Sequence, residues 1–485
     1  MKRTILIIGV LFSAITLFAQ NEVDALRYSY LIPGGTARYN AMGGSFGALG
    51  ADASTLIFNP AGMGVYHSSD FTFSPAFVIT NMDANYQGGI GEDYDVNFNI
   101  NNFSYIGSIP VNKENGVTSI NVGLSYNRLN NFHENIVVEG TNNYNSMTDW
   151  FASKASGNTY EYLDGFYTGL AWDSYLIDPD PTDTTGTQYV SAYYGDYGQT
   201  QRQIIYRNGH QGEYNFAIAA NIQHKLFIGA TLGLQSINYK EVKSLQEIDE
   251  DGLIDGFNSF TFKESLETKG SGINFKVGLL FSPVPWVRLG GAIHTPTFYD
   301  LHDNYYTSVI SDFENADYSQ AIDSEYGMFD YELTTPFRAN ASLGFVIAKQ
   351  ALLNIDYEYL DYSMARLRSN DYNFYDENTS VRNEYKPANN IKIGMEYKYG
   401  PVSFRAGGAF YDSPYASDHI NSDAYTLIYS GGIGLRSEAV YFDVSYSFIN
   451  NINYYYMYEG YGVNSPATEL VKDQSRIVTT IGFKF

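Results

Sequence analysis

The most constraining feature of this sequence is a period-two alternation of apolar and polar residues that begins near Asp70 and continues to the end of the chain. Each alternating segment is roughly ten residues long, which is the length that a tilted strand needs to cross a bilayer. Small and polar residues lie between the apolar ones, as expected for side chains that face a polar lumen. The pattern predicts transmembrane β-strands. One clear segment has its apolar residues at Phe337, Ala339, Ala341, Leu343, Phe345 and Ile347.

The connections between these segments are alternately very short and long. His224-Lys225 and Gly400-Pro401 are short, whereas 141–210 and 299–335 are long and polar. Outer-membrane barrels combine tight periplasmic turns with longer external loops. Counting strands on this rule gives about fourteen, an even number as a single-chain bacterial barrel requires. We therefore expect an all-β fold, a closed antiparallel transmembrane barrel with both chain ends on the periplasmic side.

Composition supports a barrel and excludes several other classes. The chain has 45 Tyr and 31 Phe, and these residues suit strands that meet both lipid and polar headgroups. A net charge of −24 argues against nucleic acid as a partner, because that partner needs clustered Lys and Arg. The chain has no Cys, and its seven His are dispersed, so no cofactor is expected. Composition alone leaves an extracellular array of β-sandwiches open.

The first sixty-six residues divide into two parts that do not alternate. Residues 1–19 begin with a positively charged segment, continue with an apolar stretch and end at a cleavage point after Ala19. This is the arrangement of a secretory signal peptide. Residues 20–66 are rich in Gly, which fits a compact irregular segment packed where space is tight. The lumen of so wide a barrel needs filling. We expect 20–66 to be a hatch that plugs the lumen and 67–485 to be the barrel, with long extracellular loops.

Four short runs of this hatch carry a resemblance to a known family. They are Gly35-Thr36-Ala37-Arg38, Ala41-Met42-Gly43-Gly44-Ser45-Phe46, Ala51-Asp52-Ala53-Ser54 and Asn59-Pro60-Ala61-Gly62. In these runs the chain resembles the FadL-type family, which transports long-chain fatty acids and aromatic hydrocarbons across the outer membrane. The resemblance implies a ligand route that begins at the outer loops, enters an apolar pocket and leaves sideways beside a kinked early strand. The long hydrophilic segment 141–210 departs from the family, because the apolar outer groove of the family has no counterpart there.

The Asn59-Pro60-Ala61-Gly62 turn is expected to fix the hatch against the barrel wall near the lateral exit. Pro restricts φ and removes one donor, while Asn tolerates the turn. Three charged hatch residues have two interpretations: they bind a ligand carboxylate, or they pair with lumen-facing charges and hold the plug in place. The second interpretation is the simpler one. These residues are Arg27, Arg38 and Asp52.

A change of parity marks a possible kink in the second predicted strand. Apolar residues occupy even positions through Ile100 and odd positions from Phe103 onward, with Asn101 and Asn102 between them. One extra residue in a strand produces such a change, because a β-bulge shifts the alternation by one. We expect the wall to be kinked at these four residues.

Two motifs suggest other chemistry. Gly43-x-Ser45-x-Gly47 matches the consensus of the nucleophile elbow of hydrolases. The buried strand before this motif and the helix after it are missing from the sequence pattern, so no enzyme is expected.

The second motif approaches the residue spacing of a calcium-binding loop, with Asn258 at the position where that loop has a bidentate Glu. A solvated acidic loop tip is the default interpretation of the second motif, and calcium is its alternative. Its carboxylates are Glu247, Asp249, Asp251 and Asp255.

The sequence therefore predicts an outer-membrane channel for passive uptake of hydrophobic small molecules, such as long-chain fatty acids, by lateral diffusion. Its expected partners are a hydrophobic ligand and the lipid bilayer. One alternative is a structural barrel that serves as a subunit of an outer-membrane assembly, with its Tyr-rich loops on partner proteins. A second alternative is a porin for polar solutes.

Overall fold

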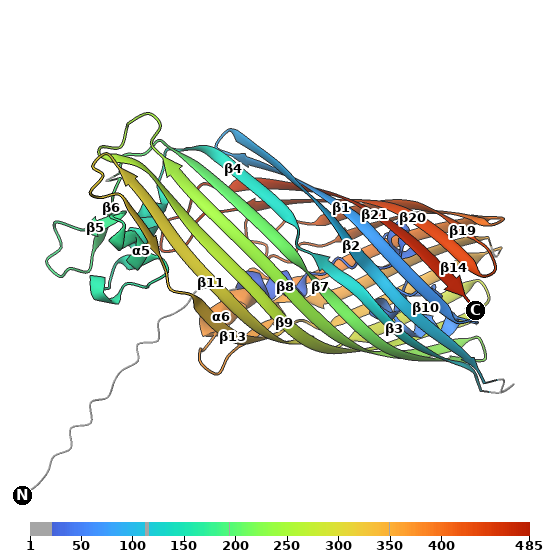
Figure 1. Cartoon of the computed structure of the whole chain (residues 1–485). Helices are drawn as coiled ribbons and strands as arrows, with labels where there is room; N and C mark the ends of the chain where they lie inside the picture. The colour runs from blue at the N-terminus through green and yellow to red at the C-terminus, as the bar shows by residue number, and fades with distance from the viewer. Residues whose placement is uncertain (1–21, 112–115, 194, 349) are drawn as a thin grey trace, which may run out of the picture.

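The computed structural model describes residues 22–111, 116–193, 195–348 and 350–485 as a tall β-barrel (Figure 1). The predicted signal peptide, 1–19, lies outside the described residues. Fourteen antiparallel spans close on themselves, as the sequence predicts, because the first strand pairs with the last. Eleven spans consist mainly of one strand: β1 (Asp70–Tyr86), β2 (Gly89–Pro110), β7 (Gln199–Ile222), β8 (Leu226–Ile248), β9 (Phe257–Val284), β15 (Ala351–Asp361), β17 (Pro387–Tyr399), β18 (Val402–Tyr411), β19 (Thr426–Arg436), β20 (Val440–Tyr455) and β21 (Thr468–Lys484).

The other three spans are each divided into two strands. They are β3 (Val117–Asn131) with β4 (Glu134–Asn142), β10 (Val287–His294) with β11 (Phe298–Phe313), and β14 (Arg338–Ile347) with β13 (Gly327–Thr334). Pro296 and Pro336 lie in two of the breaks, where the missing N–H of proline interrupts a strand ladder. The short strand β12 (Gln320–Asp323) extends the hairpin between β11 and β13.

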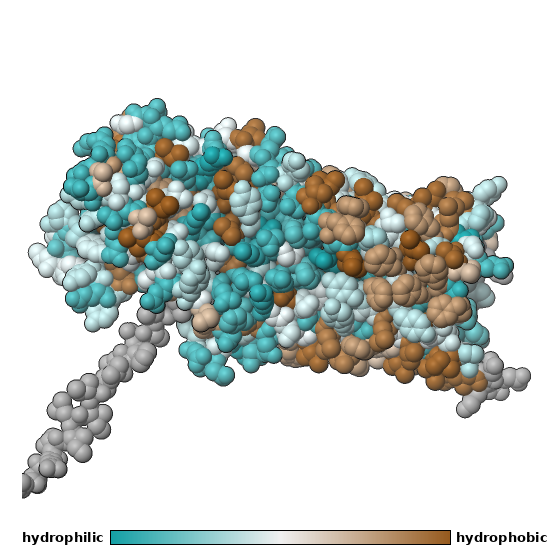
Figure 2. All heavy atoms as spheres, viewed as in Figure 1, coloured by the Kyte–Doolittle hydropathy of each residue, from teal (hydrophilic) through white to brown (hydrophobic). Residues whose placement is uncertain are grey.

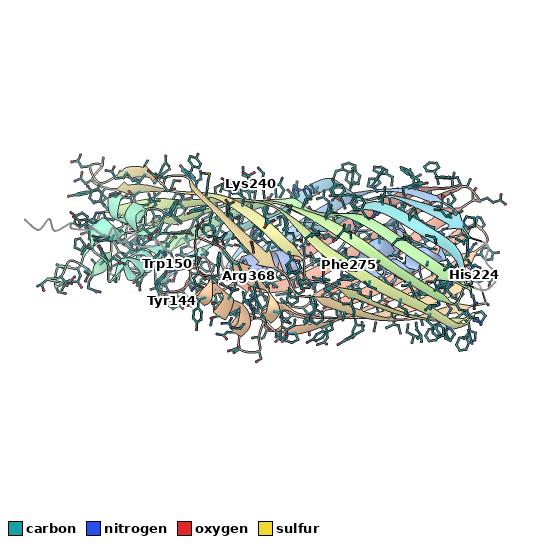
Figure 3. The ribbon with its side chains drawn as sticks, turned by 90° about the horizontal axis from the view of Figure 1, so that it is seen from below. Tyr144, Trp150, His224, Lys240, Phe275 and Arg368 are labelled. Carbon is teal, nitrogen blue, oxygen red and sulfur yellow. The ribbon has the colours of Figure 1, made fainter. Side chains whose placement is uncertain are left out.

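On the face that Figure 2 shows, an apolar belt covers the half of the barrel that carries the C-terminus. On β20, Phe442 is exposed and the neighbouring Asp443 is buried in the lumen, so the alternation sorts side chains as predicted. Figure 3 places Phe275 in this half and His224 at its end, whereas Tyr144 and Trp150 lie at the opposite end. The belt is the surface that a bilayer covers, because apolar side chains leave water there.

Several predicted loops are largely strand. The segment 299–335 forms β11 to β13, and the end of 141–210 belongs to β7. Outside the bilayer the outward face of a strand needs no apolar residues, so the alternation fades although the hydrogen-bonded ladder continues. The strands therefore rise well above the belt and form a polar outer half (Figure 2).

Two helical insertions lie in the outer half. We call residues 143–198 the cap; it contains α4 (Met147–Ala155), η2 (Tyr160–Tyr162), α5 (Thr168–Asp173), β5 (Ile177–Pro179) and β6 (Tyr189–Ser191). Phe151 and Leu176 of the cap are fully buried against barrel residues such as Phe260, so the cap is docked by an apolar core. The second insertion consists of η3 (Tyr362–Met364), β16 (Arg366–Arg368) and α6 (Tyr375–Glu384).

The hatch fills the lumen with four short helices: α1 (Glu22–Ser29), α2 (Ala37–Ala41), α3 (Thr55–Phe58) and η1 (Pro60–Val65). α1 lies in the outer half, where Tyr28 packs on Tyr239 with ring centroids 6.3 Å apart. The chain ends at Phe485, whose N–H donates to the Ser69 carbonyl beside the short turns. Both ends were expected on the side of the short turns. This expectation is wrong for the N-terminal end of the described chain, because α1 is buried among aromatic side chains of the outer half.

No helix within the described ranges is long and apolar enough to cross a membrane.

Candidate functional site

The barrel wall is interrupted between β2 and the β3–β4 span. Pairing of β2 with β3 runs from Pro110↔Ser119 up to Asn102↔Asn127 and ends there. Above that point, residues 89–101 of β2 pair with β1 alone among the strands that the structure describes. The third span breaks between Asn131 and Glu134, and β4 then pairs with β7 while it packs against the upper parts of β1 and β2 without joining their ladder. We call this interruption the wall break.

A β-bulge in β2 begins the wall break. Ser74 of β1 pairs with Asn102, and the next residue, Pro75, pairs with Ile100, so Asn101 is the extra residue. The bulge lies where the alternation changes parity, between Ile100 and Phe103. Both of these apolar side chains are exposed on the outer face of the wall, whereas Asn101 and Asn102 are buried. The kink thus keeps the apolar face toward the outside on either side of the bulge.

The hatch lies directly against the wall break. The Gly34 N–H donates to the carbonyl of Arg128 on β3, with N and O 2.9 Å apart. A Cβ on Gly34 would lie 2.6 Å from Cγ of Asn101, so only glycine lets the hatch backbone approach the bulge this closely. The Asn130 side-chain amide donates to the Tyr30 carbonyl over 2.6 Å. The hatch therefore covers the Arg128 carbonyl, which β2 leaves unpaired, and contacts the side chains of the bulge and of Asn130.

The Asn59-Pro60-Ala61-Gly62 turn lies elsewhere than expected. Asn59 donates from Nδ2 to the carbonyl of Gly47, at 2.7 Å, and to that of Leu279 on β9, at 3.2 Å. Pro60 packs on Gly229 of β8, where a side chain would overlap the Pro60 carbonyl. The turn therefore fixes the hatch to the wall, but to β8 and β9 and not beside the first three strands. The close approach requires glycines in the wall, and β8 and β9 supply them.

The charged hatch residues have three different roles. Arg38 donates to Glu396 of β17 through Nε (2.8 Å) and a second nitrogen (3.0 Å), which ties the hatch to the wall. Asp52 accepts from the Thr36 hydroxyl and the Ser54 N–H, both at 2.9 Å, and so braces the hatch internally.

Arg27, the third of these residues, pairs with Asp24 within α1. Its guanidinium carbon also lies 4.3 Å from the ring centroid of Tyr239. Of the three, only Arg38 pairs with a charged residue of the wall.

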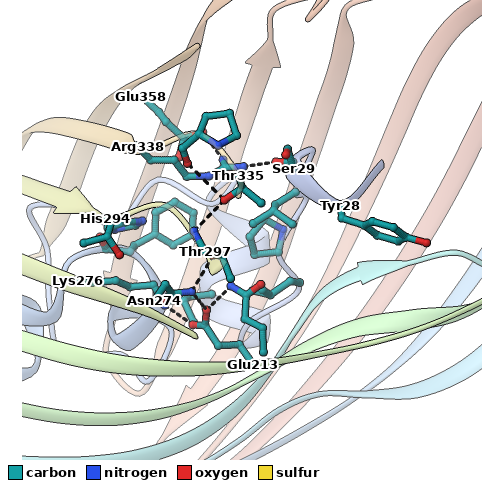
Figure 4. Close-up of a pocket in the computed structure, with 18 of the residues that line it drawn as sticks. Tyr28, Ser29, Glu213, Asn274, Lys276, His294, Thr297, Thr335, Arg338 and Glu358 are labelled. Carbon is teal, nitrogen blue, oxygen red and sulfur yellow. Dashed lines mark hydrogen bonds and ion pairs between the residues drawn. The ribbon is translucent and has the colours of Figure 1, made fainter. Parts of the chain in front are cut away.

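A narrow cavity of about 50 Å³ lies in the lumen beside the hatch (Figure 4). Its hatch side is apolar and includes Leu31 and Phe58. Its wall side carries ion pairs, among them Lys276 with Glu213, and Arg338 with Glu358 at 3.4 Å. The resemblance implied an apolar pocket, whereas the cavity that is present has charged side chains along its wall side. Pro33 and Leu129 line it too, so the cavity reaches the residues next to the wall break.

A larger cavity of about 470 Å³ lies in the outer half, above α1. α1 separates the two cavities: Arg27 lines the outer one and Tyr28 the inner one. Burial raises the pKa of Glu22, at the edge of the outer cavity, to about 7. Carboxylates outnumber cations in this lining, so the outer cavity is acidic. The carboxylates are Glu22, Asp24, Asp164, Glu241, Glu264, Glu384 and Glu459, and the cations are Arg27, Lys154, Arg207 and Lys243.

The four candidate calcium ligands are not brought together. Glu247 is fully buried on β8, where its carboxylate accepts from the Ser146 hydroxyl at 2.5 Å and the Met147 N–H at 2.9 Å. Asp249 accepts from the N–H groups of the following turn instead. No group of three or more acidic, His or Cys residues that could hold a metal ion occurs in the described part of the chain.

Sequence reasoning found Asn101 and Asn102 of the wall break but missed Arg128 and Arg476. Arg128 has the same parity as Leu124 and Tyr126, whose side chains face outward on β3. An arginine on the apolar parity of a strand is a signal that could have been found. Arg476 of β21 has lumenal parity, so nothing in the alternation distinguishes it.

The sequence matches no model of a known family and no curated protein. The fold matches solved barrels across nearly the whole chain. A FadL homologue of Pseudomonas aeruginosa superposes with a TM-score of 0.59 at 13% identity, covering 94% of this chain and 100% of that one. The Pseudomonas putida toluene transporter TodX gives 0.54 at 14% identity, with coverage of 94% and 100%.

CymD, a monoaromatic hydrocarbon channel, gives a TM-score of 0.50 at 14% identity, covering 93% of this chain and 98% of that one. At these identities the likeness establishes the fold: a closed fourteen-stranded barrel of the FadL type.

Proposed function

We propose that this chain is an outer-membrane channel through which hydrophobic small molecules diffuse, and that they pass between lumen and lipid at the wall break. The apolar belt supports a place in a membrane, and the short turns support the usual outer-membrane orientation. The proteins with this fold that are named as a toluene transporter and a monoaromatic hydrocarbon channel support the ligand class.

The observation that carries the proposal is the end of β2–β3 pairing at Asn102↔Asn127. An unpaired backbone group in contact with lipid costs several kcal/mol, so a barrel interrupts its wall only where something else covers those groups. Here Gly34 of the hatch provides part of the cover. A wall that served only as a scaffold has no need for such an interruption.

The lumen argues against a porin for polar solutes. The hatch runs from α1 in the outer half to η1 near the short turns, and the inner cavity beside it holds about 50 Å³. A ligand therefore needs a sideways route, which suits a molecule that is soluble in lipid. The interaction-barrel alternative has no specific observation in its favour.

Uptake by intact cells tests the proposal. The chain is expressed in a Gram-negative host whose outer membrane lacks hydrocarbon channels, and entry of radiolabelled toluene and of a polar sugar is measured. We expect toluene entry to rise at least about tenfold over the empty vector, with sugar entry unchanged. Unchanged toluene entry with the barrel folded in the membrane would contradict the proposal, and a rise in sugar entry alone would favour a porin.

A further inference from the structure

The upper part of β2 has a free edge. Residues 89–101 pair with β1 on one side, and no strand of the described ranges pairs with them on the other side. In an antiparallel pair, alternate residues direct their N–H and C=O groups toward the same neighbour. Tyr94 points away from β1, because its N–H donates to the Asp93 carboxylate and its carbonyl accepts from the Asn135 amide. The even-numbered residues from 90 to 100 therefore direct their backbone groups toward the free edge.

β4 lies behind this part of β2 and leaves the edge open. β4 stands beside the β1–β2 hairpin (Figure 1). A Cβ on Gly91 would overlap the Val137 carbonyl oxygen of β4, and a Cβ on Gly89 would overlap that of Glu139. Side chains stand perpendicular to the direction of the ladder, so β4 covers the inner face of β2. Among the even-numbered residues from 90 to 100, only Tyr94 has its edge-facing backbone groups bonded within the described part of the chain.

A second free edge of the barrel is closed by a side chain. β20 pairs with β19 only as far as Asn451. Above that residue, the Asn421 side chain accepts from the Tyr454 N–H at 2.6 Å and donates to the Tyr454 carbonyl at 2.9 Å. The free edge of β2 is longer, and cover of this kind reaches Tyr94 alone. An uncovered strand edge is a template on which another strand can pair.

The outward face beside the free edge stays apolar above the belt. On β1 the outward residues change to Asn81, Asp83 and Asn85, which marks the upper limit of the lipid on that strand. Asn81 pairs with Tyr94 and Asn85 with Ile90, and these two residues of β2 are 64% and 70% exposed. Covering an apolar side chain that lies in water is favourable, so these residues add to the affinity for a strand placed beside them.

Three carboxylates on this stretch set the charge of a fitting strand. In the described part of the chain, neither Glu92 nor Asp93 has a cation within 4.0 Å, and Asp95 has only His133, at 3.8 Å. Opposite charges across a strand pair stabilise it and like charges destabilise it. The free edge therefore selects a basic segment, and the net charge of −24 on the whole chain favours the same sign.

A second copy of this chain does not fit the free edge. Two identical edge strands pair antiparallel about a two-fold axis that is perpendicular to the sheet, and in a barrel wall that axis lies in the membrane plane. One of the two barrels would then be inverted in the membrane. Parallel pairing would place the three carboxylates beside those of the other copy, which is destabilising. The free edge fits a different chain.

We propose that the free edge of β2, over residues 90–98, binds an extended basic segment of another protein by β-strand addition. Main-chain hydrogen bonds to the even-numbered residues supply affinity, and basic side chains opposite the three carboxylates supply selectivity. The inference goes beyond the proposed function and does not depend on it, because residues 90–98 lie above the bulge at Asn101. It also differs from the interaction-barrel alternative, since it uses a strand edge and not the Tyr-rich loops.

Peptide binding to the full chain in phosphatidylcholine nanodiscs tests the inference. The probe is a labelled peptide of about nine residues with alternating Val and Lys and blocked ends, and its fluorescence anisotropy is measured with empty discs subtracted. We expect it to bind at least about tenfold more tightly than the same peptide methylated on its internal amide nitrogens, because methylation removes the donors and keeps the charge. A peptide of alternating Val and Glu should also bind at least about tenfold more weakly.

A proline in the free edge tests the same contact from the side of the protein. Val96→Pro removes an N–H that points away from β1, so the β1–β2 ladder keeps its hydrogen bonds. The affinity for the Val–Lys peptide should fall at least about fivefold. Val96→Thr keeps the N–H and is the matched control, with unchanged affinity. Folding of both variants is checked by heat-modifiable mobility in gel electrophoresis.

Equal binding of the methylated and unmethylated peptides to the unaltered chain would overturn the inference, whether or not the proline variant folds. Undiminished binding by folded Val96→Pro, or equal binding to empty discs, would overturn it as well. Dimers in detergent that Val96→Pro dissociates would assign the edge to a second copy and contradict the proposal. Toluene uptake tests the proposed function alone, so the two can fail separately.

Discussion

Two stretches of the same barrel wall, β8–β9 and β2–β3, are built in opposite ways. The β8–β9 ladder is unbroken from Leu226↔Phe281 to Ile248↔Ser259, whereas the β2–β3 ladder stops at Asn102↔Asn127. The hatch is anchored to the first stretch by Asn59 and lies against the second as a cover. The closed wall holds the plug, and on the proposed function the wall break provides the exit.

The largest expected effect comes from breaking an anchor on the closed part of the wall. Glu396→Gln leaves the buried Arg38 and Arg405 without their shared carboxylate, which costs about 3–5 kcal/mol for a broken buried ion pair. We expect a loosened hatch, seen as faster amide exchange in α2 and as entry of polar sugars. Glu139→Gln, at an exposed pair, should change neither. Unchanged exchange in the first variant would mean that the hatch is held by other contacts.

The two stretches are also expected to differ in how deep their outward faces lie in the lipid, which has the second-largest effect. Val277→Arg, on the outward face of β9 within the belt, should cost about 2–4 kcal/mol as judged by urea unfolding in vesicles. Phe98→Arg, on the part of β2 above the bulge, should cost about 0–1 kcal/mol because that face lies nearer the interface. Equal costs would place both residues at the same depth and remove the distinction.

Close packing under the Asn59 turn is expected to have an intermediate effect. Gly278→Val puts a side chain where Asn59 Oδ1 lies, and overpacking of this kind costs about 1–3 kcal/mol. Gly291→Val is a matched control, since the nearest atom to its Cβ, the Asn340 carbonyl oxygen, is 3.8 Å away. Permeability to sugars should rise in the first variant only. A rise in both would indicate a general loss of barrel stability.

The closed wall also carries the cap, and that attachment depends on pH. Burial raises the pKa of Glu247 to about 6 from 4.5. In an open cap the same carboxyl loses its proton near pH 4.5, so the docked cap binds more protons between these values and becomes less stable as pH rises through them. The loss at pH 7.5 is about 2 kcal/mol. Amide exchange of α4 should therefore be slower at pH 5, after correction for intrinsic rates, and Glu247→Gln should abolish the difference.

The sequence predicts the structure of some regions of this molecule better than that of others. In the belt, lipid demands apolar residues on one parity, so strands such as β20 can be assigned residue by residue. In the outer half no solvent boundary enforces the alternation, and 299–335 looks like a loop although it forms β11 to β13.

The wall break could be predicted from the parity change between Ile100 and Phe103, because a bulge alters the periodicity of the sequence directly. The position of the Asn59 turn could not be predicted. It depends on Gly229 and Gly278, which approach it only in the folded barrel. Arg476 gave no signal for the same reason: its polar partners, the Pro33 carbonyl and the Asn40 side chain of the hatch, approach it only in the folded barrel.

On the proposed function, ligands leave through the wall break, and filling that break tests this claim most directly. Asn131→Trp adds bulk at the end of β3, where both polar atoms of Asn131 are buried without a partner. Asn208→Trp, at an exposed residue paired with Lys240 in the closed wall, is the control. Toluene uptake should fall at least about tenfold in the first variant and stay unchanged in the second, with equal amounts of folded barrel. Undiminished uptake in Asn131→Trp would contradict the claim.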